Sequence, residues 1–164
     1  MLVVSNTSPL SNLAIVGRLH LLSDRYATVT IPSMVRQELN ALAHAEGRLA
    51  INDAVERGWL VVEDLPESLD LSAYLECADP GECEAIALAE VKRADKILLD
   101  DRAGRELARE RGLKVVGVLG ELLYAKQVGR IASVRGEMEK LQTEARFFIH
   151  ADLKALILAE AGEQ

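Results

Sequence analysis

Cysteine and histidine are scarce in this chain of 164 residues. The two cysteines, Cys77 and Cys83, match neither a zinc-binding pair nor a disulfide framework, so we expect a reducing, cytoplasmic compartment. The three histidines (His20, His44 and His150) are scattered and give a zinc site little support.

Long apolar runs and aromatic residues are also few. No apolar run approaches the ~20 residues that a membrane span requires. Because Met1 leads directly into a strand-like Leu-Val-Val, we expect no secretory signal. Aromatics make up only 4% of the chain, so we expect an aliphatic core.

What is present indicates an ordinary globular protein. About half of the residues (49%) are hydrophobic and 27% are charged, which excludes a disordered chain. The formal net charge of −7 argues against a protein whose whole surface grips nucleic acid. It does not exclude a nuclease, because a metal site concentrates carboxylates and its cations reverse the local field.

Segments typical of strands and helices alternate along the first 127 residues. The predicted strands cover 2–5, 27–31, 59–63, 96–99 and 114–116. The predicted helices cover 8–17, 19–22, 33–42, 48–57, 79–92, 102–111 and 117–127, with a weak helix somewhere within 64–78. Such alternation predicts a three-layer α/β/α domain around a mostly parallel sheet, because each parallel crossover needs a helix.

The chain is expected to form one domain over 1–164. Its α/β core would cover 1–127, and 128–164 would add a helical extension with helices near 134–145 and 150–161. The first helix is expected to begin with Ser8 as its cap and Pro9 at its first position.

Polar and acidic side chains follow two of the predicted strands. Asn6 comes after the first strand, and Asp100 and Asp101 come after the strand at 96–99. In parallel sheets, sites lie outside the carboxyl ends of the strands. Acids at strand ends and helix starts, far apart in sequence, therefore suggest one shared site for a divalent cation, to which Glu38, Glu82 and Glu84 would contribute.

Each of these residues also has a simpler explanation. One of the two aspartates can cap the helix that starts at Arg102, and Glu82 can complete a capping box with Asp79. Glu84 lies two positions from Glu82, so on a regular helix only one of them faces the cation, although in the looser first turn both could. Glu38 can be solvated, and Asn6 can be a turn residue. Arg102, Arg105 and Arg109 share one helical face, where they could be solvated or hold phosphates.

Taken together, four segments resemble the PIN-domain nuclease superfamily. They are Val3–Ser8 (VVSNTS), Ile31–Leu39 (IPSMVRQEL), Gly81–Ala89 (GECEAIALA) and Ile97–Asp101 (ILLDD). The Gly-Glu-x-Glu-Ala run is also similar to one in flap endonucleases. Within the superfamily the chain is closest to a bacterial and archaeal PIN-like family, which it resembles in 112–120 (GLKVVGVLG) and in its last residues, 158–163 (LAEAGE).

The resemblance implies a Mg²⁺- or Mn²⁺-dependent ribonuclease. It implies metal ligands at Asn6, Glu38, Glu82, Glu84, Asp100 and Asp101, with Glu38, Glu84, Asp100 and Asp101 catalytic. Thr7 and Ser8 match small polar residues near the metal or phosphate, and Arg102 and Arg105 would help to bind substrate. Many relatives are toxins of toxin–antitoxin pairs, inhibited by a small partner protein, and are commonly dimers or larger oligomers. One or two cations ~3.5–4 Å apart can activate water and stabilise both oxygens of the reacting phosphate.

Asn6 stands where the family carries an aspartate, and two hypotheses follow. In one, the protein is a degenerate member that binds RNA or a protein partner without cutting. In the other, the natural sequence carries Asp at this position and the substitution was introduced. A more distant alternative is a non-enzymatic assembly subunit.

Independently, Leu153, Leu156 and Ile157 form an apolar stripe in the last helix, which predicts a homodimer or larger oligomer.

Overall fold

The computed structural model describes residues 1–74 and 79–164. Its centre is a five-stranded sheet in the order β3-β2-β1-β4-β5, in which every neighbouring pair is parallel. The strands are β1 (Val3–Ser5), β2 (Val29–Ile31), β3 (Leu60–Val62), β4 (Lys96–Leu98) and β5 (Val115–Val116). Helices flank the sheet, so the predicted three-layer α/β/α fold is confirmed.

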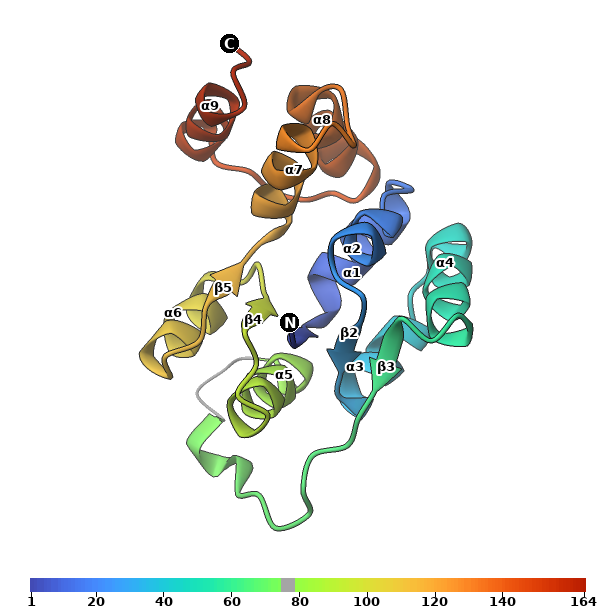
Figure 1. Ribbon diagram of the computed structural model, residues 1–164, viewed down its shortest axis with the longest axis vertical. Coiled ribbons are helices and arrows are strands. Elements are labelled where there is room, and N and C mark those ends of the chain that lie inside the picture. The colour runs from blue at the N-terminus through green and yellow to red at the C-terminus, as the bar shows by residue number, and fades with distance from the viewer. Residues whose placement is uncertain (75–78) are drawn as a thin grey trace.

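The helices connect the strands and then continue into a helical tail (Figure 1). Before β4 they are α1 (Thr7–Ile15), α2 (His20–Arg25), α3 (Ser33–Asn40), α4 (Ala45–Glu56), the 3₁₀ turn η1 (Leu71–Tyr74) and α5 (Pro80–Val91). After β4 they are α6 (Arg102–Glu110), α7 (Val118–Gln127), α8 (Val134–Glu144) and α9 (Ala151–Glu160). Among the described residues, no helix is both long and apolar enough to cross a membrane.

The strand order creates a switch point between β1 and β4. From β1 the chain winds outward to β2 and β3, and from β4 it winds the other way to β5. The register pairs Ser5 with Leu98, so the carboxyl ends of the two central strands lie level with each other. In open α/β sheets ligands bind in the crevice at such a point, and the residues that follow β1 and β4 are therefore the first place to look for chemistry.

The core is aliphatic, as the composition predicts. Val3 and Val4 of β1 and Ile97 of β4 are fully buried. Helix α5 packs on β1 and β4 and buries a continuous run, Ala85 to Ala89, almost completely. Each large aliphatic side chain hidden in this way contributes about 1.5–3 kcal/mol of hydrophobic stabilisation.

Two predicted helix starts are wrong. Helix α1 begins at Thr7 with Asn6 in the cap position, so Ser8 is not its cap and Pro9 is its third residue. Proline is tolerated there because the N–H groups of the first turn have no partner within the helix. Helix α4 begins at Ala45, earlier than predicted, because the imidazole of His44 accepts a hydrogen bond from the Gly47 N–H at 2.9 Å. Part of the region predicted as loop and weak helix, 75–78, lies outside the described residues.

Glu163, near the end of the chain, forms hydrogen bonds with the start of α8. The Glu163 carboxylate accepts hydrogen bonds from the N–H groups of Val134 (2.7 Å) and Arg135 (3.2 Å) and from the Ser133 hydroxyl (2.8 Å). Burial alone would raise the pKa of Glu163, but these bonds and the nearby Lys126 together lower it to about 2. The carboxylate thus complements the positive end of the helix dipole.

We expect Glu163→Gln to lower the free energy of unfolding by about 1 kcal/mol at neutral pH, since it removes a charged helix cap. Because the folded-state pKa lies below the ordinary value of 4.5, the stabilisation is present above pH 4.5 and disappears as the pH falls toward 2. Urea unfolding of both proteins at pH 7 and pH 3 measures this difference. Glu110→Gln, at an exposed position, is the control; equal stabilities of wild type and Glu163→Gln at pH 7 would contradict the prediction.

Candidate functional site

A pocket of about 490 Å³ opens at the carboxyl ends of β1 and β4. We call it the acid pocket, because five carboxylic acids line it. Its acidic lining residues are Glu38, Asp79, Glu82, Asp100 and Asp101. The other named residues of its wall are Asn6, Thr7, Ser8, Ser11, Asn12, Ala145, Arg146, Phe147 and Phe148.

Asn6 and Asp100 come from the two central strands and form the base of the pocket. The Asn6 N–H donates to the Leu98 carbonyl at 3.0 Å, which ties the end of β1 to β4. Asp100 is held by the Val118 N–H, which donates to its Oδ1 at 3.0 Å. Within the described residues, neither Asn6 Oδ1 nor Asp100 Oδ2 has a hydrogen-bond partner although both atoms are buried. Two buried acceptors left open in this way suit an external donor or a cation.

Burial dominates the electrostatics of Asp100. It raises the pKa of this carboxyl to about 6, while the Val118 N–H and the neighbouring Arg105 guanidinium act in the opposite direction. Burial likewise lowers the pKa of Arg105, with repulsion from Arg109 adding to the effect and attraction to Asp100 opposing it. A positive charge brought to the pocket would therefore favour the ionised form of Asp100.

Glu38 reaches the pocket from α3, the helix that follows β2, the strand next to β1. Its carboxylate accepts a hydrogen bond from the Thr7 hydroxyl, so the first turn of α1 orients it. Burial is the main cause that raises its pKa, the Thr7 bond lowers it, and the nearby Asp79 carboxylate raises it again. Two carboxylates so close together disfavour each other's ionised form, and such pairs are common in sites that bind cations or protons.

The structure separates the two glutamates at the start of α5. Glu82 is only 3% exposed and lines the acid pocket. Glu84 does not line it; instead its carboxylate accepts from the Met34 N–H at 3.3 Å, at the first turn of α3. Of the pair, Glu82 therefore occupies the place that the sequence comparison with the superfamily gave to Glu84.

Two further acids of the pocket hold helix starts. Asp101 accepts from the Gly104 N–H at 3.0 Å and caps α6, which is the simpler of the two roles that the sequence allows for one of the paired aspartates. Asp79 accepts from the Gly81 N–H at 3.0 Å and caps α5. Sequence reasoning treated Asp79 only as a cap and missed its place beside Glu38; the Asp-Pro pair at a helix start explains the cap but carries no long-range signal.

Glycines make room for three of the carboxylates. A Cβ on Gly81 would lie 2.6 Å from Glu38 Oε2, and one on Gly104 would lie 2.5 Å from Glu82 Cδ. One on Gly117 would lie 2.6 Å from Asp100 Oδ1. All three distances are far shorter than ordinary contacts, so any larger residue would displace these acids.

The predicted substrate-binding residues divide between two places. Thr7 and Ser8 line the acid pocket. Arg102 and Arg105 do not; both line a neighbouring groove beside Asp100. Arg102 is almost fully exposed and pairs with Glu106 at 3.3 Å, whereas Arg105 is half-buried and donates weakly to the Leu99 carbonyl at 3.4 Å.

The donor set of the pocket suits a hard divalent cation. All of its candidate ligands are carboxylate or amide oxygens, which Mg²⁺ and Mn²⁺ prefer. Two of these oxygens, from Asn6 and Asp100, are buried and open. Over residues 1–74 and 79–164, no three acidic, histidine or cysteine side chains are gathered closely enough to hold one ion without moving.

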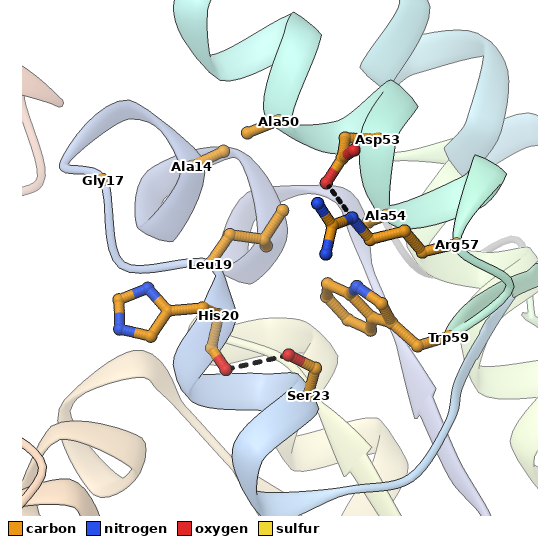
Figure 2. Close-up of a pocket in the computed structure, with 10 residues that line it drawn as sticks. All are labelled: Ala14, Gly17, Leu19, His20, Ser23, Ala50, Asp53, Ala54, Arg57 and Trp59. Atoms are coloured by element: carbon orange, nitrogen blue, oxygen red, sulfur yellow. Dashed lines mark hydrogen bonds and ion pairs between the residues drawn. The ribbon is translucent and has the colours of Figure 1, made fainter.

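A second pocket, of about 300 Å³, lies near the amino ends of the strands, where α1, α2, α4 and the start of β3 meet (Figure 2). Its one acid among the named lining residues, Asp53, is paired with Arg57 at 2.8 Å. Trp59 and His20 also line it, and the Ser23 hydroxyl donates to the His20 carbonyl at 3.0 Å. With its single carboxylate already neutralised, this pocket does not suit a cation.

Matched substitutions can separate the two glutamates of α5. We expect Glu82→Gln to weaken Mn²⁺ binding by about tenfold or more, because it removes a charge from the pocket. Glu84→Gln should leave Mn²⁺ binding nearly unchanged and cost about 0.5–1 kcal/mol of stability through its bond to α3. Titration calorimetry and urea unfolding of both variants provide the measurements, and a larger loss of Mn²⁺ affinity in Glu84→Gln would reverse the assignment.

Comparison with known proteins gives one family match. The sequence model of the family described as PIN domain matches residues 2–163. No curated protein matches the chain. Among solved structures, the chain is similar to a domain of a functionally unknown protein from Methanocaldococcus jannaschii DSM 2661, with 23% identity and a TM-score of 0.45. That similarity covers 70% of this chain and 89% of the other.

Proposed function

Because the chain belongs to the PIN-domain family, which has a nuclease-type fold, we propose that it is a divalent-metal-dependent ribonuclease, the toxin of a toxin–antitoxin pair. The observation that carries the proposal is the acid pocket at the switch point of the sheet. Five acids from three separate segments meet there with Asn6 from a fourth, and two buried oxygens remain without partners within the described chain. A structural role alone does not explain such a concentration of carboxylates.

PIN domains generally use divalent metal ions, and Mg²⁺ or Mn²⁺ is the cofactor of this proposal. Asn6, Glu38, Glu82 and Asp100 would hold it, with Asp101 and Asp79 adding negative charge from the pocket wall. When bound, the cation supplies an activated water and stabilises charge on the phosphate that is cleaved. Mg²⁺ keeps several waters, so a few protein oxygens are sufficient.

The chain's own groups position these ligands. The Thr7 hydroxyl fixes the Glu38 carboxylate, and the Val118 N–H fixes Asp100 while leaving its second oxygen open to the pocket. Gly81 and Gly104 let Glu38 and Glu82 approach the neighbouring helices closely. Such preorganisation lowers the cost of assembling the site when cation and substrate arrive.

The alternative function is that of a catalytically degenerate PIN-like subunit that binds RNA or another protein. The observation that favours it is Asn6 itself, since its neutral amide brings one negative charge fewer than an aspartate to a buried position of the pocket. The same structure serves both functions, and only activity separates them.

An RNA-cleavage assay with the wild-type protein in Mn²⁺, Mg²⁺ and EDTA tests the proposal, together with calorimetric titration of Mn²⁺. Cleavage that requires the cation and is lost in Glu38→Gln supports the ribonuclease. Cation binding without cleavage would support the degenerate subunit. The absence of any cation binding would contradict both and favour a non-enzymatic assembly role.

Self-association belongs to the same proposal, as does a small antitoxin partner. Helix α9 buries Ile157 and Leu158, but it leaves Leu153 42% and Leu156 57% exposed. Exposed apolar side chains gathered on one helix are typical of interfaces. We expect a homodimer or larger oligomer at micromolar concentration, which Leu156→Glu weakens. Light scattering behind a sizing column measures the mass, and a monomer mass for the wild type would refute this prediction.

A further inference from the structure

The connection between α8 and α9 forms one wall of the acid pocket. After α8 ends at Glu144, residues Ala145 to Phe148 all line the pocket. The Phe147 N–H donates to the Leu141 carbonyl at 2.9 Å, so the connection is anchored to the last turn of α8. The helical extension therefore contributes side chains directly to the candidate site.

Arg146 has an unusual backbone. Its φ is +53°, in the left-handed region that non-glycine residues rarely adopt. Its side chain is exposed, and within the described residues its guanidinium makes no hydrogen bond or ion pair. It is also the one basic residue among the named lining of the acid pocket. The left-handed turn at Arg146 ends α8 and leads the chain along the pocket wall. An exposed guanidinium without a partner in the described structure, at the edge of the pocket, suits a ligand anion.

Phe148 stands beside Arg146 with its ring largely in solvent. It is 76% exposed, as far as any large hydrophobic residue of the described chain. Its ring makes a T-shaped contact with the exposed ring of His150, with 4.8 Å between the ring centroids and 79° between the ring planes. Proteins that bind single-stranded nucleic acid use exposed aromatic rings beside basic side chains, with the ring stacking on a base.

A groove of about 700 Å³ continues from this wall. The groove shares Asp100, Phe147 and Phe148 with the acid pocket. One side carries Arg102, Arg105 and Arg109 of α6 together with Glu106, and the other side, formed by α7 and α9, is mainly apolar with Glu160 at its edge. A chain with regularly spaced negative charges and flat apolar groups complements both sides.

We propose that Arg146 and Phe148 form a nucleotide subsite at the mouth of the acid pocket. Arg146 binds a backbone phosphate of single-stranded RNA, Phe148 stacks on an adjacent base, and the arginines of α6 receive the strand beyond it. The subsite rests on the proposed function, because the acid pocket is where the cleaved phosphate lies. It goes beyond that function by assigning substrate recognition to the helical extension.

Binding can be measured apart from cleavage. Fluorescence anisotropy with a labelled single-stranded RNA of about ten nucleotides, in EDTA, reports affinity alone. We expect Phe148→Ala and Arg146→Gly each to weaken binding by about fivefold or more. Arg146→Gly should also lower the slope of log affinity against log salt by about 0.7, the value for one phosphate contact on a single strand, whereas Phe148→Ala should not.

The chain offers matched controls. Arg93 is the other non-glycine residue with positive φ among the described residues, at +52°, and it lines neither the pocket nor the groove. Arg93→Gly therefore relieves the same backbone strain and removes the same charge, and should leave RNA affinity unchanged. Leu49, which is 64% exposed on α4, provides the control Leu49→Ala for Phe148→Ala.

The outcomes separate the subsite from the ribonuclease. Weaker RNA binding in both subsite variants, but not in the controls, supports the subsite even if the wild type does not cleave. Unchanged RNA affinity in Phe148→Ala and Arg146→Gly overturns it even if the wild type is an active nuclease. Unchanged affinity together with a smaller oligomer mass in Phe148→Ala also overturns it and assigns the wall to contact between copies of the chain.

Discussion

Replacing Asn6 by aspartate should tighten Mn²⁺ binding by on the order of ten- to a hundredfold and raise RNA cleavage by a comparable factor. Asn6 is 5% exposed, and its Oδ1 is an open, buried acceptor in the described structure. A carboxylate at this position keeps the acceptor and adds a full negative charge where water screens it least. Calorimetric titration of Mn²⁺ and a cleavage assay on both proteins measure the two effects.

The same substitution should destabilise the protein when no cation is present. An added carboxylate would share the pocket with Asp100, whose pKa burial already raises to about 6. Bringing a second buried charge close to it costs free energy that only a cation restores. We therefore expect Asn6→Asp to melt below the wild type in EDTA and to gain more than the wild type from saturating Mn²⁺.

A matched control lies in the same pocket. Asn12 lines its wall from α1 but is only partly buried. Asn12→Asp adds the same charge without placing it at the end of β1, so we expect less than about a threefold change in Mn²⁺ affinity. Equal affinity and activity in wild type and Asn6→Asp would contradict the prediction, and an active wild type would show that the remaining acids suffice.

The fold could be predicted from the sequence because the patterns that indicate strands and helices are local. Alternating strand and helix segments predicted a parallel sheet, and the parallel sheet predicted that the residues after β1 and β4 meet. The structure places Asn6 and Asp100 in one pocket, as that reasoning requires. The first residues of the helices were harder to predict. His44 caps α4 through its imidazole, a role for which serine, threonine, aspartate and asparagine are the usual residues.

The choice between Glu82 and Glu84 could not be made from the sequence. Residues two apart on a helix point about 200° away from each other, so only one can face the pocket. Which one does so depends on the rotation of α5, and an amphipathic stripe normally fixes that rotation. Helix α5 is buried nearly all round from Gly81 to Ala89, so its pattern indicates a buried helix without indicating an orientation.

The pocket wall that the helical extension forms could not be predicted from the sequence, for a different reason. Nothing in the local sequence distinguishes Phe147 and Phe148, which line a distant pocket, from apolar residues that pack in a core. Their position depends on how α8 and α9 lie against α7 and α1, which are long-range contacts. The place of Arg146 beside the pocket likewise depends on how the chain turns after α8, which a sequence does not display.

Gly104→Ala should impair the site without unfolding the protein, and it tests whether Glu82 must lie where the structure places it. Alanine in place of glycine within a helix ordinarily stabilises by about 0.5–1 kcal/mol. Here the new Cβ would lie 2.5 Å from the carboxyl carbon of Glu82. The carboxylate is the far end of a flexible side chain, so it should move aside, lose its place in the pocket and cancel the helix gain. We expect Mn²⁺ affinity to fall by about tenfold or more.

Gly136→Ala is a closely matched control. Gly104 and Gly136 each occupy the third position of a helix, and the N–H of each donates to the capping side chain at 3.0 Å. A Cβ on Gly136 would meet nothing closer than Ser133 Oγ at 3.5 Å, an ordinary contact. This variant should therefore show the full helix gain in urea unfolding and no change in Mn²⁺ affinity.

A double substitution completes the test of Gly104. Glu82→Asp shortens the side chain by one methylene and so makes room for the new Cβ. If displacement of the carboxylate is the cause, Glu82→Asp should weaken Mn²⁺ binding less in the Gly104→Ala background than in the wild type, and the double-mutant cycle should show coupling of about 0.5 kcal/mol or more. Additive effects of the two substitutions would instead mean that Gly104 acts on the site by another route than through Glu82.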